Sequence, residues 1–335
     1  MVVTSQMRGE GLKVRALWYD APGSAIVRDE ILDASCPPGM ALVATKWSAI
    51  SRGTERLVMS GKVPAAEYGR MRAPFQSGDF PFPVKYGYCA AGIVEDGPAE
   101  LAGKHVFALH PHQDRFYLAA DQLCVLPDGL PLRRAALAAN METALNAVWD
   151  SGAGPGDNII VIGAGIVGLL IAYLCARIPG TQVTAIDPLP ERAAVASAFG
   201  ARFQLPEAPL PDGGADIVFH TSASQQGLAL ALHAAGTEAR VVEVSWYGDK
   251  DITINLGGSF HSRRLQLVSS QVGHVSPSRQ QRWTYRRRLA KALELLCDSA
   301  LDALVTEEFA FEDLPQKLPA YLNEKSAGLA ALVRY

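Results

Sequence analysis

The chain has few cysteines and no long apolar run. Its 335 residues include five cysteines, which are scattered and form no Cys-x-x-Cys pair. An odd and dispersed set argues against a disulfide framework and against a four-cysteine zinc lobe. No run approaches the roughly 20 apolar residues that span a bilayer, and the amino terminus lacks an apolar stretch of signal-peptide length. We therefore expect a cytoplasmic protein that does not bind a membrane.

An excess of one charge is also lacking. Lysine and arginine number 31 against 34 for aspartate and glutamate, which gives a formal net charge of −3. This balance does not indicate a nucleic-acid partner. The one basic cluster, Arg282 to Arg288, falls among apolar residues at helical spacing, and we predict a solvated helix face there. At this length about two domains are expected.

The most informative feature is a glycine motif between an apolar run and a helical segment. Residues 158–162 are Asn-Ile-Ile-Val-Ile, and Gly163, Gly165 and Gly168 follow in the pattern Gly-x-Gly-x-x-Gly. Gly163 would allow a tight turn, Gly165 would let the backbone approach a pyrophosphate, and Gly168 would let the helix pack against the strand. The helix N-terminus would offer free N–H groups to the anion. The motif therefore predicts a dinucleotide site.

An acidic residue at the end of the next apolar run favours NAD as the cofactor. Residues 182–186 predict a second strand, and Asp187 follows it, nineteen residues after Gly168. A carboxylate there accepts hydrogen bonds from the adenosine ribose and would repel a 2′-phosphate. The alternative is a structural βα turn in which Asp187 caps a helix that begins near Pro188.

Short apolar runs separated by glycine and proline predict a β-rich, barrel-like unit over residues 13–125. The expected strands are 14–19, 25–27, 40–45, 92–95, 104–109 and 115–118. Between them, residues 61–83 contain four prolines and few periodic features. This segment predicts a long loop, and loops of such length inside a compact domain are usually functional.

From residue 132 the pattern changes to helices and strands in alternation. After a helix over 132–149, the expected elements are 158–162, 166–178, 182–186, 190–199, 216–221, 225–235, 239–246 and 265–270. This alternation predicts an α/β fold with a parallel, doubly wound sheet. The tail is mixed, with expected elements at 283–297, 306–311, 313–324 and 329–334.

Several motifs resemble those of the medium-chain dehydrogenase/reductase superfamily. They are Ser-Arg-Gly-Thr-Glu at 51–55, Gly-Tyr-Cys-Ala-Ala-Gly at 87–92, Gly-Lys-His-Val-Phe at 103–107, Gly-Ala-Gly-Pro-Gly-Asp at 152–157, and Asp-Pro-Leu-Pro-Glu-Arg at 187–192. The resemblance covers nearly the whole chain. It implies a GroES-like β-rich catalytic domain at 1–139 and 276–335 and a Rossmann NAD-binding domain at 140–275.

The resemblance also implies that the catalytic zinc of this superfamily is missing. Where zinc alcohol dehydrogenases carry a cysteine and a His-Glu pair, this chain has Arg52, Tyr88 and Cys89. A cation, a phenol and one thiol do not replace a thiolate, an imidazole and a carboxylate around Zn²⁺. Residues 103–121 contain no cysteine, so the structural zinc lobe is missing too. The sequence Ser-x-Gly-Thr-Glu-Arg-Leu resembles the zinc-lacking branch that includes the bacteriochlorophyllide 3-hydroxyethyl dehydrogenases.

Without zinc, hydrogen-bond donors must polarise the carbonyl oxygen and move the proton. Tyr88 is the first candidate for a general acid, with a packed barrel tyrosine as the alternative. Thr54 matches a relay hydroxyl, or else caps a turn. His110, in His-Pro-His, is a competing proton donor or an ordinary surface histidine. The two imidazoles lack evident further ligands, and we predict no metal site.

Other side chains are expected around the same cleft. Arg52 would bind an oxyanion or pair with an acid, and Glu142 would either line the site or form a salt bridge. The expected substrate contacts are Trp47, Arg52, Glu55, His112, Glu142 and Trp246. The expected cofactor contacts are Thr143, Gly163, Gly165, Ile166, Val167, Gly168, Asp187, Arg192, Thr221, Ser222, Ser245 and Ser270.

Together these features predict a zinc-independent, NAD-dependent oxidoreductase that interconverts an alcohol and a carbonyl by hydride transfer. A reductase of an activated C=C bond is an alternative within the same fold, because that chemistry also dispenses with zinc. A non-catalytic nicotinamide-dinucleotide sensor is the alternative outside enzymology. We expect a small-molecule substrate and a homodimer or homotetramer.

Overall fold

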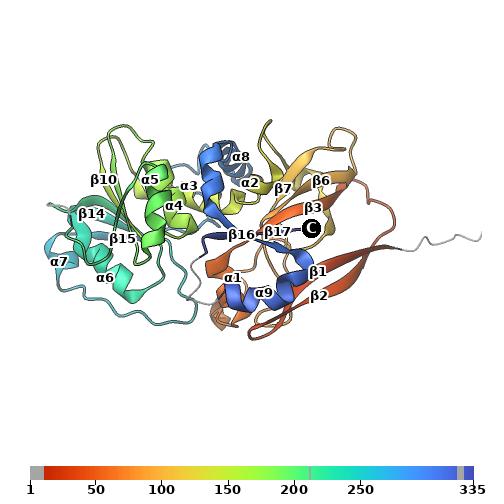
Figure 1. Ribbon diagram of the computed structural model, residues 1–335, viewed down its shortest axis with the longest axis horizontal. Coiled ribbons are helices and arrows are strands. Elements are labelled where there is room, and N and C mark those ends of the chain that lie inside the picture. Colours follow the sequence, from red (N-terminus) through yellow and green to blue (C-terminus); the bar gives the residue numbers. More distant parts are fainter. Residues whose placement is uncertain (1–10, 211–212, 323–327) are drawn as a thin grey trace, which may run out of the picture.

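The computed structural model describes residues 11–210, 213–322 and 328–335. Two parts lie side by side along the long axis of the molecule (Figure 1). The first third of the chain and the tail form a β-rich part, and the middle of the chain forms an α/β part.

Two sheets make up the β-rich part. The four-stranded sheet has the order β2-β1-β5-β4, with bounds Ser24–Leu32, Leu12–Ala21, Val84–Lys85 and Ser77–Gly78. The seven-stranded sheet has the order β16-β17-β3-β6-β7-β9, and β8 also pairs with β3. Its bounds, in chain order, are β3 (Met40–Ile50), β6 (Ala90–Asp96), β7 (His105–Ala108), β8 (Arg115–Ala119), β9 (Cys124–Val125), β16 (Val305–Ala310) and β17 (Ala330–Arg334).

The tail of the chain completes the larger of these sheets. β17 pairs antiparallel with β3, from Ala331 opposite Ile50 to Arg334 opposite Trp47, and β16 pairs parallel with β17. The tail of the chain therefore shares a sheet with strands from the first third of the chain. The division at 139/140 and 275/276 stays a prediction.

The α/β part is built on six parallel strands in the order β12-β11-β10-β13-β14-β15. Their bounds are Arg202–Gln204, Gln182–Ile186, Asn158–Ile162, Ala215–His220, Ala235–Glu243 and Gln266–Ser269. Alternate residues of β10 enter two different cores: Ile159 and Val161 join the core of α3 (Ala138–Ser151) and α4 (Ile166–Cys175), whereas Ile160 and Ile162 join that of α6 (Gln225–Ala234). Helices thus cover both faces, which confirms the predicted doubly wound sheet.

The remaining helices are short. They are α1 (Arg52–Met59), α2 (Leu132–Ala135), α5 (Ala193–Ala198), α7 (Ser259–Ser262), α8 (Tyr285–Leu295) and α9 (Leu314–Tyr321). The 3-10 helices are η1 (Ala65–Glu67), η2 (Ala120–Gln122), η3 (Pro190–Arg192), η4 (Ser299–Leu304) and η5 (Phe311–Asp313).

Some element boundaries differ from the predictions. The helix expected over 132–149 is broken into α2 and α3, because the chain tightens where the Leu137 N–H donates to the Arg134 carbonyl at 3.0 Å. The expected loop 61–83 contains η1 and β4. The strand expected at 239–246 ends at Glu243, whose carboxylate accepts the Ser245 N–H at 2.8 Å and turns the chain. Residues 323 and 324 of the expected tail helix lie outside the described residues.

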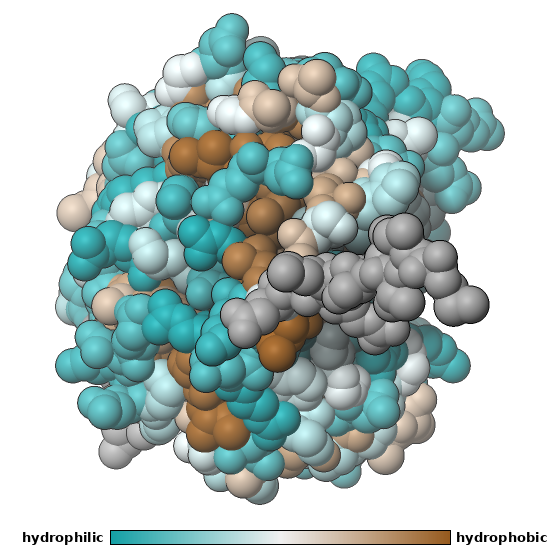
Figure 2. Space-filling view, turned by 90° about the vertical axis from the view of Figure 1, so that its right-hand side faces the viewer, coloured by the Kyte–Doolittle hydropathy of each residue, from teal (hydrophilic) through white to brown (hydrophobic). Residues whose placement is uncertain are grey.

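Hydrophilic side chains cover most of the β-rich end of the molecule, and apolar side chains form a narrow band down this face (Figure 2). Among the described residues, no helix has both the length and the apolar character needed to cross a bilayer.

A buried ion pair joins α8 to α3. Arg288 is 2% exposed, and its Nε donates to Oε1 of Glu142 at 3.0 Å. Its Nη1 donates to Asn146 Oδ1 at 2.6 Å and to the His274 carbonyl at 3.1 Å. The solvated helix face expected for the basic cluster is therefore wrong at Arg288. Glu142 forms the salt bridge that was the alternative to a substrate contact, and burial raises its pKa even though Arg288 opposes the shift.

Removing one partner should leave a buried charge without compensation. We expect Arg288→Met to lower the free energy of unfolding by about 3 kcal/mol or more. Adding Glu142→Gln should recover part of the loss, because the unpaired carboxylate is then removed. Urea unfolding measures both effects, and Arg287→Gln on the exposed side of α8 is the control, with a change below about 1 kcal/mol. Equal costs for Arg288→Met and Arg287→Gln would contradict a structural role for the pair.

Candidate active site and dinucleotide cradle

The glycine motif forms the turn between β10 and α4. Gly163 has a φ of +100°, and a Cβ there would lie 2.8 Å from Thr221 Oγ1. A Cβ on Gly168 would lie 1.9 Å from the Gly163 carbonyl oxygen. Gly165 is the N-cap of α4, and the space at its Cβ position is open. Two of the glycines thus allow close packing, while the third leaves the helix N-terminus accessible to an anion.

Asp187 follows β11 directly and holds the glycine turn. Its Oδ2 accepts the Ala164 N–H at 2.7 Å, and its Oδ1 accepts the Leu189 N–H at 2.9 Å. Each carboxylate oxygen has a further lone pair, so hydrogen bonds to ribose hydroxyls remain open to it. We call the glycine turn together with Asp187 the dinucleotide cradle.

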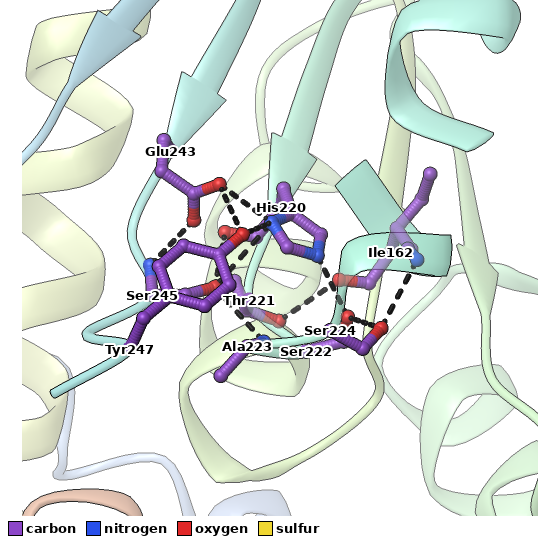
Figure 3. A network of polar contacts seen from close by, with 10 residues as sticks. Ile162, His220, Thr221, Ser222, Ala223, Ser224, Glu243, Ser245 and Tyr247 are labelled. Atoms are coloured by element: carbon purple, nitrogen blue, oxygen red, sulfur yellow. Dashed lines mark hydrogen bonds and ion pairs between the residues drawn. The ribbon is translucent and has the colours of Figure 1, made fainter. Parts of the chain in front are cut away.

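A polar network borders this cradle at the carboxyl ends of β13 and β14 (Figure 3). Thr221 Oγ1 donates to the Gly163 carbonyl at 2.7 Å. The imidazole of His220 is buried. Its Nδ1 lies 2.7 Å from Glu243 Oε2, and its Nε2 lies 2.7 Å from Ser222 Oγ. Tyr247 donates to the same Glu243 oxygen at 2.9 Å.

The carboxylate of this network remains ionised. Burial alone would raise the pKa of Glu243, but hydrogen bonding and charge from His220 outweigh burial and lower it. The sequence analysis named Thr221, Ser222 and Ser245 but missed His220 and Glu243. The available signal was a polar residue at the end of each of two apolar runs, since parallel strands bring such ends to one edge of the sheet.

Glu55 and His112 form a second imidazole–carboxylate pair, inside the β-rich part. Both side chains are 0% exposed, and His112 Nε2 lies 3.1 Å from Glu55 Oε2. Tyr19 donates to Glu55 at 2.5 Å, and the Ser51 N–H donates at 2.6 Å. Although burial alone would raise the pKa of Glu55, His112 and these hydrogen bonds lower it. Full burial contradicts the expectation that Glu55 and His112 contact the substrate.

Tyr88 belongs to a cluster of hydroxyl groups at the start of α1. Its hydroxyl donates to Ser51 Oγ at 2.5 Å and also hydrogen-bonds with Thr54. Burial raises the pKa of Tyr88, so the phenol keeps its proton at neutral pH. Ser51, the residue before Arg52, is thus a partner of the Tyr88 hydroxyl.

Arg52 instead lies toward the tail of the chain. Its Nη1 donates to the Gly328 carbonyl at 2.8 Å, and Arg192 donates to the same oxygen at 3.1 Å. Burial lowers the pKa of Arg192, with Asp187 opposing the shift and Arg52 adding to it. Arg52 therefore lies on the side of the cradle.

His110 is not a surface histidine. Its ring stacks on Phe116 with centroids 3.6 Å apart and planes 6° apart, and its Nδ1 lies 3.0 Å from the Pro111 carbonyl oxygen. Burial lowers the pKa of His110 to about 3, so the imidazole is neutral at pH 7. A neutral ring carries a proton on only one nitrogen.

The other expected contacts are spread over both parts. Ile166 and Val167 open α4, Ser245 Oγ accepts the Ala223 N–H at 3.0 Å, and Trp47 packs against the core that contains Cys89 and Phe107. Two hydroxyls already donate within the protein: Thr143 to the Ala139 carbonyl at 2.9 Å, and Ser270 to Asp150 at 2.7 Å.

A cavity of about 430 Å³ opens between the β-rich and α/β parts. Its walls come from α1 and the turn after it, from α9, and from the loops after β13 and β14, where Trp246 lies. Leu57 of α1 lines the cavity. Thr54 precedes Leu57 by three residues and is on the same helix face, so the Tyr88 cluster is one helical turn away.

The donors around Tyr88 do not fit a catalytic zinc. No group of three or more His, Cys, Asp or Glu side chains that could hold a metal ion occurs within residues 11–210, 213–322 and 328–335. Burial raises the pKa of the Cys89 thiol, which opposes a thiolate. Glu55 and His112 are already paired with each other.

Two curated relatives are dehydrogenases. The galactitol 1-phosphate 5-dehydrogenase of Escherichia coli is 26% identical over 219 residues, which is 62% of either chain. The chain thus spans less than two thirds of that relative's length. The (R,R)-butanediol dehydrogenase of Bacillus subtilis is 23% identical over 354 residues, covering 93% of this chain and 96% of the relative. No protein-family model matches the chain.

Solved structures show the same fold. A zinc-binding dehydrogenase from Sinorhizobium meliloti, bound to NADP, has a TM-score of 0.76 at 17% identity, covering 97% of this chain and all of the other. A short chain alcohol dehydrogenase from Escherichia coli, complexed with NADH, has a TM-score of 0.76 at 14% identity, covering 97% and 100%. The chain is homologous to zinc-type, alcohol dehydrogenase-like proteins of the medium-chain dehydrogenase/reductase superfamily, and it has their fold.

Alanine at two of the glycines should have different effects. Gly168→Ala should lower the free energy of unfolding by about 2 kcal/mol and abolish NADH binding, because its Cβ meets a backbone oxygen. The Cβ of Gly165→Ala would contact no other atom, so this variant should lower the free energy of unfolding by at most about 1 kcal/mol. Its affinity for NADH should still fall at least about tenfold. Thermal unfolding and calorimetric titration measure these effects. Normal NADH binding by both variants would refute the assignment of the cradle.

Proposed function

We propose that the protein is a zinc-independent, NAD-dependent oxidoreductase that interconverts an alcohol and a carbonyl. The observation that carries this proposal is the dinucleotide cradle, in which the close packing at Gly163 and Gly168 leaves the N-terminus of α4 open beside Asp187. Both relatives described above carry the name dehydrogenase, which supports the same class of reaction.

NAD is the dinucleotide that the proposal assigns to the cradle. One structural neighbour contains NADP and another contains NADH, so the fold accommodates both dinucleotides. The argument for NAD is the carboxylate of Asp187, which would repel a 2′-phosphate. The guanidinium of Arg192 lies near this carboxylate and opposes the repulsion, since its hydrogen bond to the neutral Gly328 carbonyl leaves its charge in place. The assignment of NAD therefore rests on Asp187 being the group that contacts the ribose.

The hydroxyl cluster at the start of α1 would manage the proton. A bound nicotinamide would supply or accept the hydride. In carbonyl reduction, Tyr88, which holds its proton at pH 7, would donate that proton to the substrate oxygen. Ser51 and Thr54, which hydrogen-bond to Tyr88, would return a proton to the phenol. Oxidation of an alcohol would use the same path in reverse.

The proposal includes a dimer of this chain. β15 is at one edge of the six-stranded sheet, and Leu267 on it is 38% exposed. A sheet edge with unpaired backbone groups and an exposed apolar side chain is suited to pairing with a second strand. We assign this edge to contact with a second copy.

The proposal predicts a preference between the two dinucleotides. NADH should bind at least about tenfold more tightly than NADPH, a difference near 1.4 kcal/mol. Asp187→Asn should narrow this gap, because it removes the charge and keeps the size of the side chain. Calorimetric titration of both variants with both cofactors measures the effect. Equal or stronger binding of NADPH by the unmodified protein would refute the assignment.

Turnover tests the chemistry itself. NAD reduction is measured with a panel of polyols, polyol phosphates and aromatic alcohols, before and after treatment with a chelator. Turnover should survive the chelator, and Tyr88→Phe should reduce it by about 10²–10⁴-fold with little change in NADH affinity. His110→Gln is the competing variant.

Three results would count against parts of this proposal. Activity that a chelator abolishes and zinc restores would refute zinc independence. Near-normal turnover in Tyr88→Phe together with a large loss of turnover in His110→Gln would assign the role of proton donor to His110. NADH binding without turnover of any alcohol or carbonyl would favour the sensor.

A further inference from the structure

The cavity between the two parts has a strongly cationic wall. Arg56 on α1, Lys62 in the turn after it, and Lys250 in the loop after β14 all line it. Within the described part of the chain, its lining contains neither aspartate nor glutamate. Arg56 and Lys62 carry like charges on the wall of one small space, and an anion between them relieves their repulsion. The charge pattern therefore favours a ligand that carries a negative group.

Apolar and aromatic side chains form the rest of the cavity wall. Trp246, Leu57 and Leu322 contribute indole and branched aliphatic surface. Large aromatic surfaces with a few placed polar groups are typical of sites for small organic molecules. A volume of about 430 Å³ accommodates a compact organic molecule rather than a lone inorganic ion. The two kinds of wall together favour a molecule with an acidic group on an apolar body.

The cavity is beside the dinucleotide cradle and distinct from it. Ala223 lines the cavity and follows Thr221, which contacts the Gly163 carbonyl. Neither the glycine turn nor Asp187 contributes to the lining. The pyrophosphate of a dinucleotide thus has its own anion site at α4, and the cavity wall offers Arg56 and Lys62 to a second ligand. In doubly wound folds, ligands bind outside the carboxyl ends of the strands, where Ala223 and Trp246 lie.

We propose that this cavity binds the substrate as an acidic, partly apolar molecule, either a carboxylic acid or a phosphate monoester of an aromatic or hydrocarbon alcohol. Arg56 and Lys62 hold the acidic group, and Trp246 and Leu57 contact the apolar body. That this ligand is a substrate rests on the proposed function, because the carbon of its alcohol group must reach the nicotinamide. The preference for an acidic ligand is measured without turnover.

Matched probes separate charge from shape. Calorimetric titration uses 1-naphthoate, its neutral amide 1-naphthamide, and 1-naphthyl phosphate, each with and without saturating NADH. 1-Naphthoate or 1-naphthyl phosphate should bind at least about tenfold more tightly than the amide. Whichever of the two binds more tightly shows whether the cavity recognises a carboxylate or a phosphate. Raising the salt concentration from 0.05 to about 0.5 M should weaken the acids and leave the amide unchanged.

Charge-neutralising variants locate the site. Arg56→Gln combined with Lys62→Gln should weaken acid binding at least about tenfold and leave amide and NADH binding unchanged. The control is Lys13→Gln, which removes an exposed cation near the start of β1, at the opposite end of that strand from Gly23 in the cavity wall. Lys13→Gln should have no effect on any probe.

Three outcomes would overturn the proposal. They are equal binding of acid and amide, equal loss in Lys13→Gln and in the double variant, and a loss of NADH binding in the double variant that leaves 1-naphthoate unaffected. The last outcome would assign the cations to the cofactor. Failure of the protein to bind NADH, with normal charge-dependent binding of the acids, would refute the proposed function and leave the ligand class of the cavity standing.

Discussion

The antiparallel pairing of β17 with β3 is the constraint on which the site depends. It returns the tail of the chain to the β-rich part and brings Gly328 to the point where Arg52 and Arg192 both donate to its carbonyl. The hydroxyl of Tyr335 lies 3.0 Å from Ser48 Oγ, and Ser48 in turn contacts His112, which is buried with Glu55. A change in this pairing would therefore disturb the arginines and the buried network together.

Two polar networks of the same composition serve the two parts of the molecule. In each, an imidazole lies between a carboxylate and a serine hydroxyl, and a tyrosine donates to the same carboxylate. The network of Glu55 and His112 is fully enclosed, so it fixes the position of Ser51 and hence the hydroxyls near Tyr88. The network of Glu243 and His220 ends at the exposed Ser222, so it reaches solvent beside the cradle. Similar chemistry thus has a purely structural use in one part and an accessible position in the other.

The sequence predicted the features that depend on periodicity and on glycine. The alternation of predicted helices and strands indicated the parallel sheet, and the spacing of Gly163, Gly165 and Gly168 indicated the turn between β10 and α4. Side-chain direction around α1 could not be read in the same way. The hydroxyl partner of Tyr88 is Ser51, which lies just before α1, and the motif at 51–55 does not indicate which of its side chains meets Tyr88. Burial of Arg288 was equally inaccessible, because the carboxylate that neutralises it, Glu142, lies on α3, 146 residues away in the sequence.

The double use of Asp187 has a consequence for engineering and for evolutionary change. Its carboxylate accepts two backbone N–H groups that hold the glycine turn and the start of the next segment. The residue to which we assign the discrimination between phosphorylated and unphosphorylated ribose is therefore also part of the scaffold. A small apolar residue in its place would remove both acceptors, whereas asparagine would keep one of them. A change of cofactor preference at this position is thus coupled to local folding.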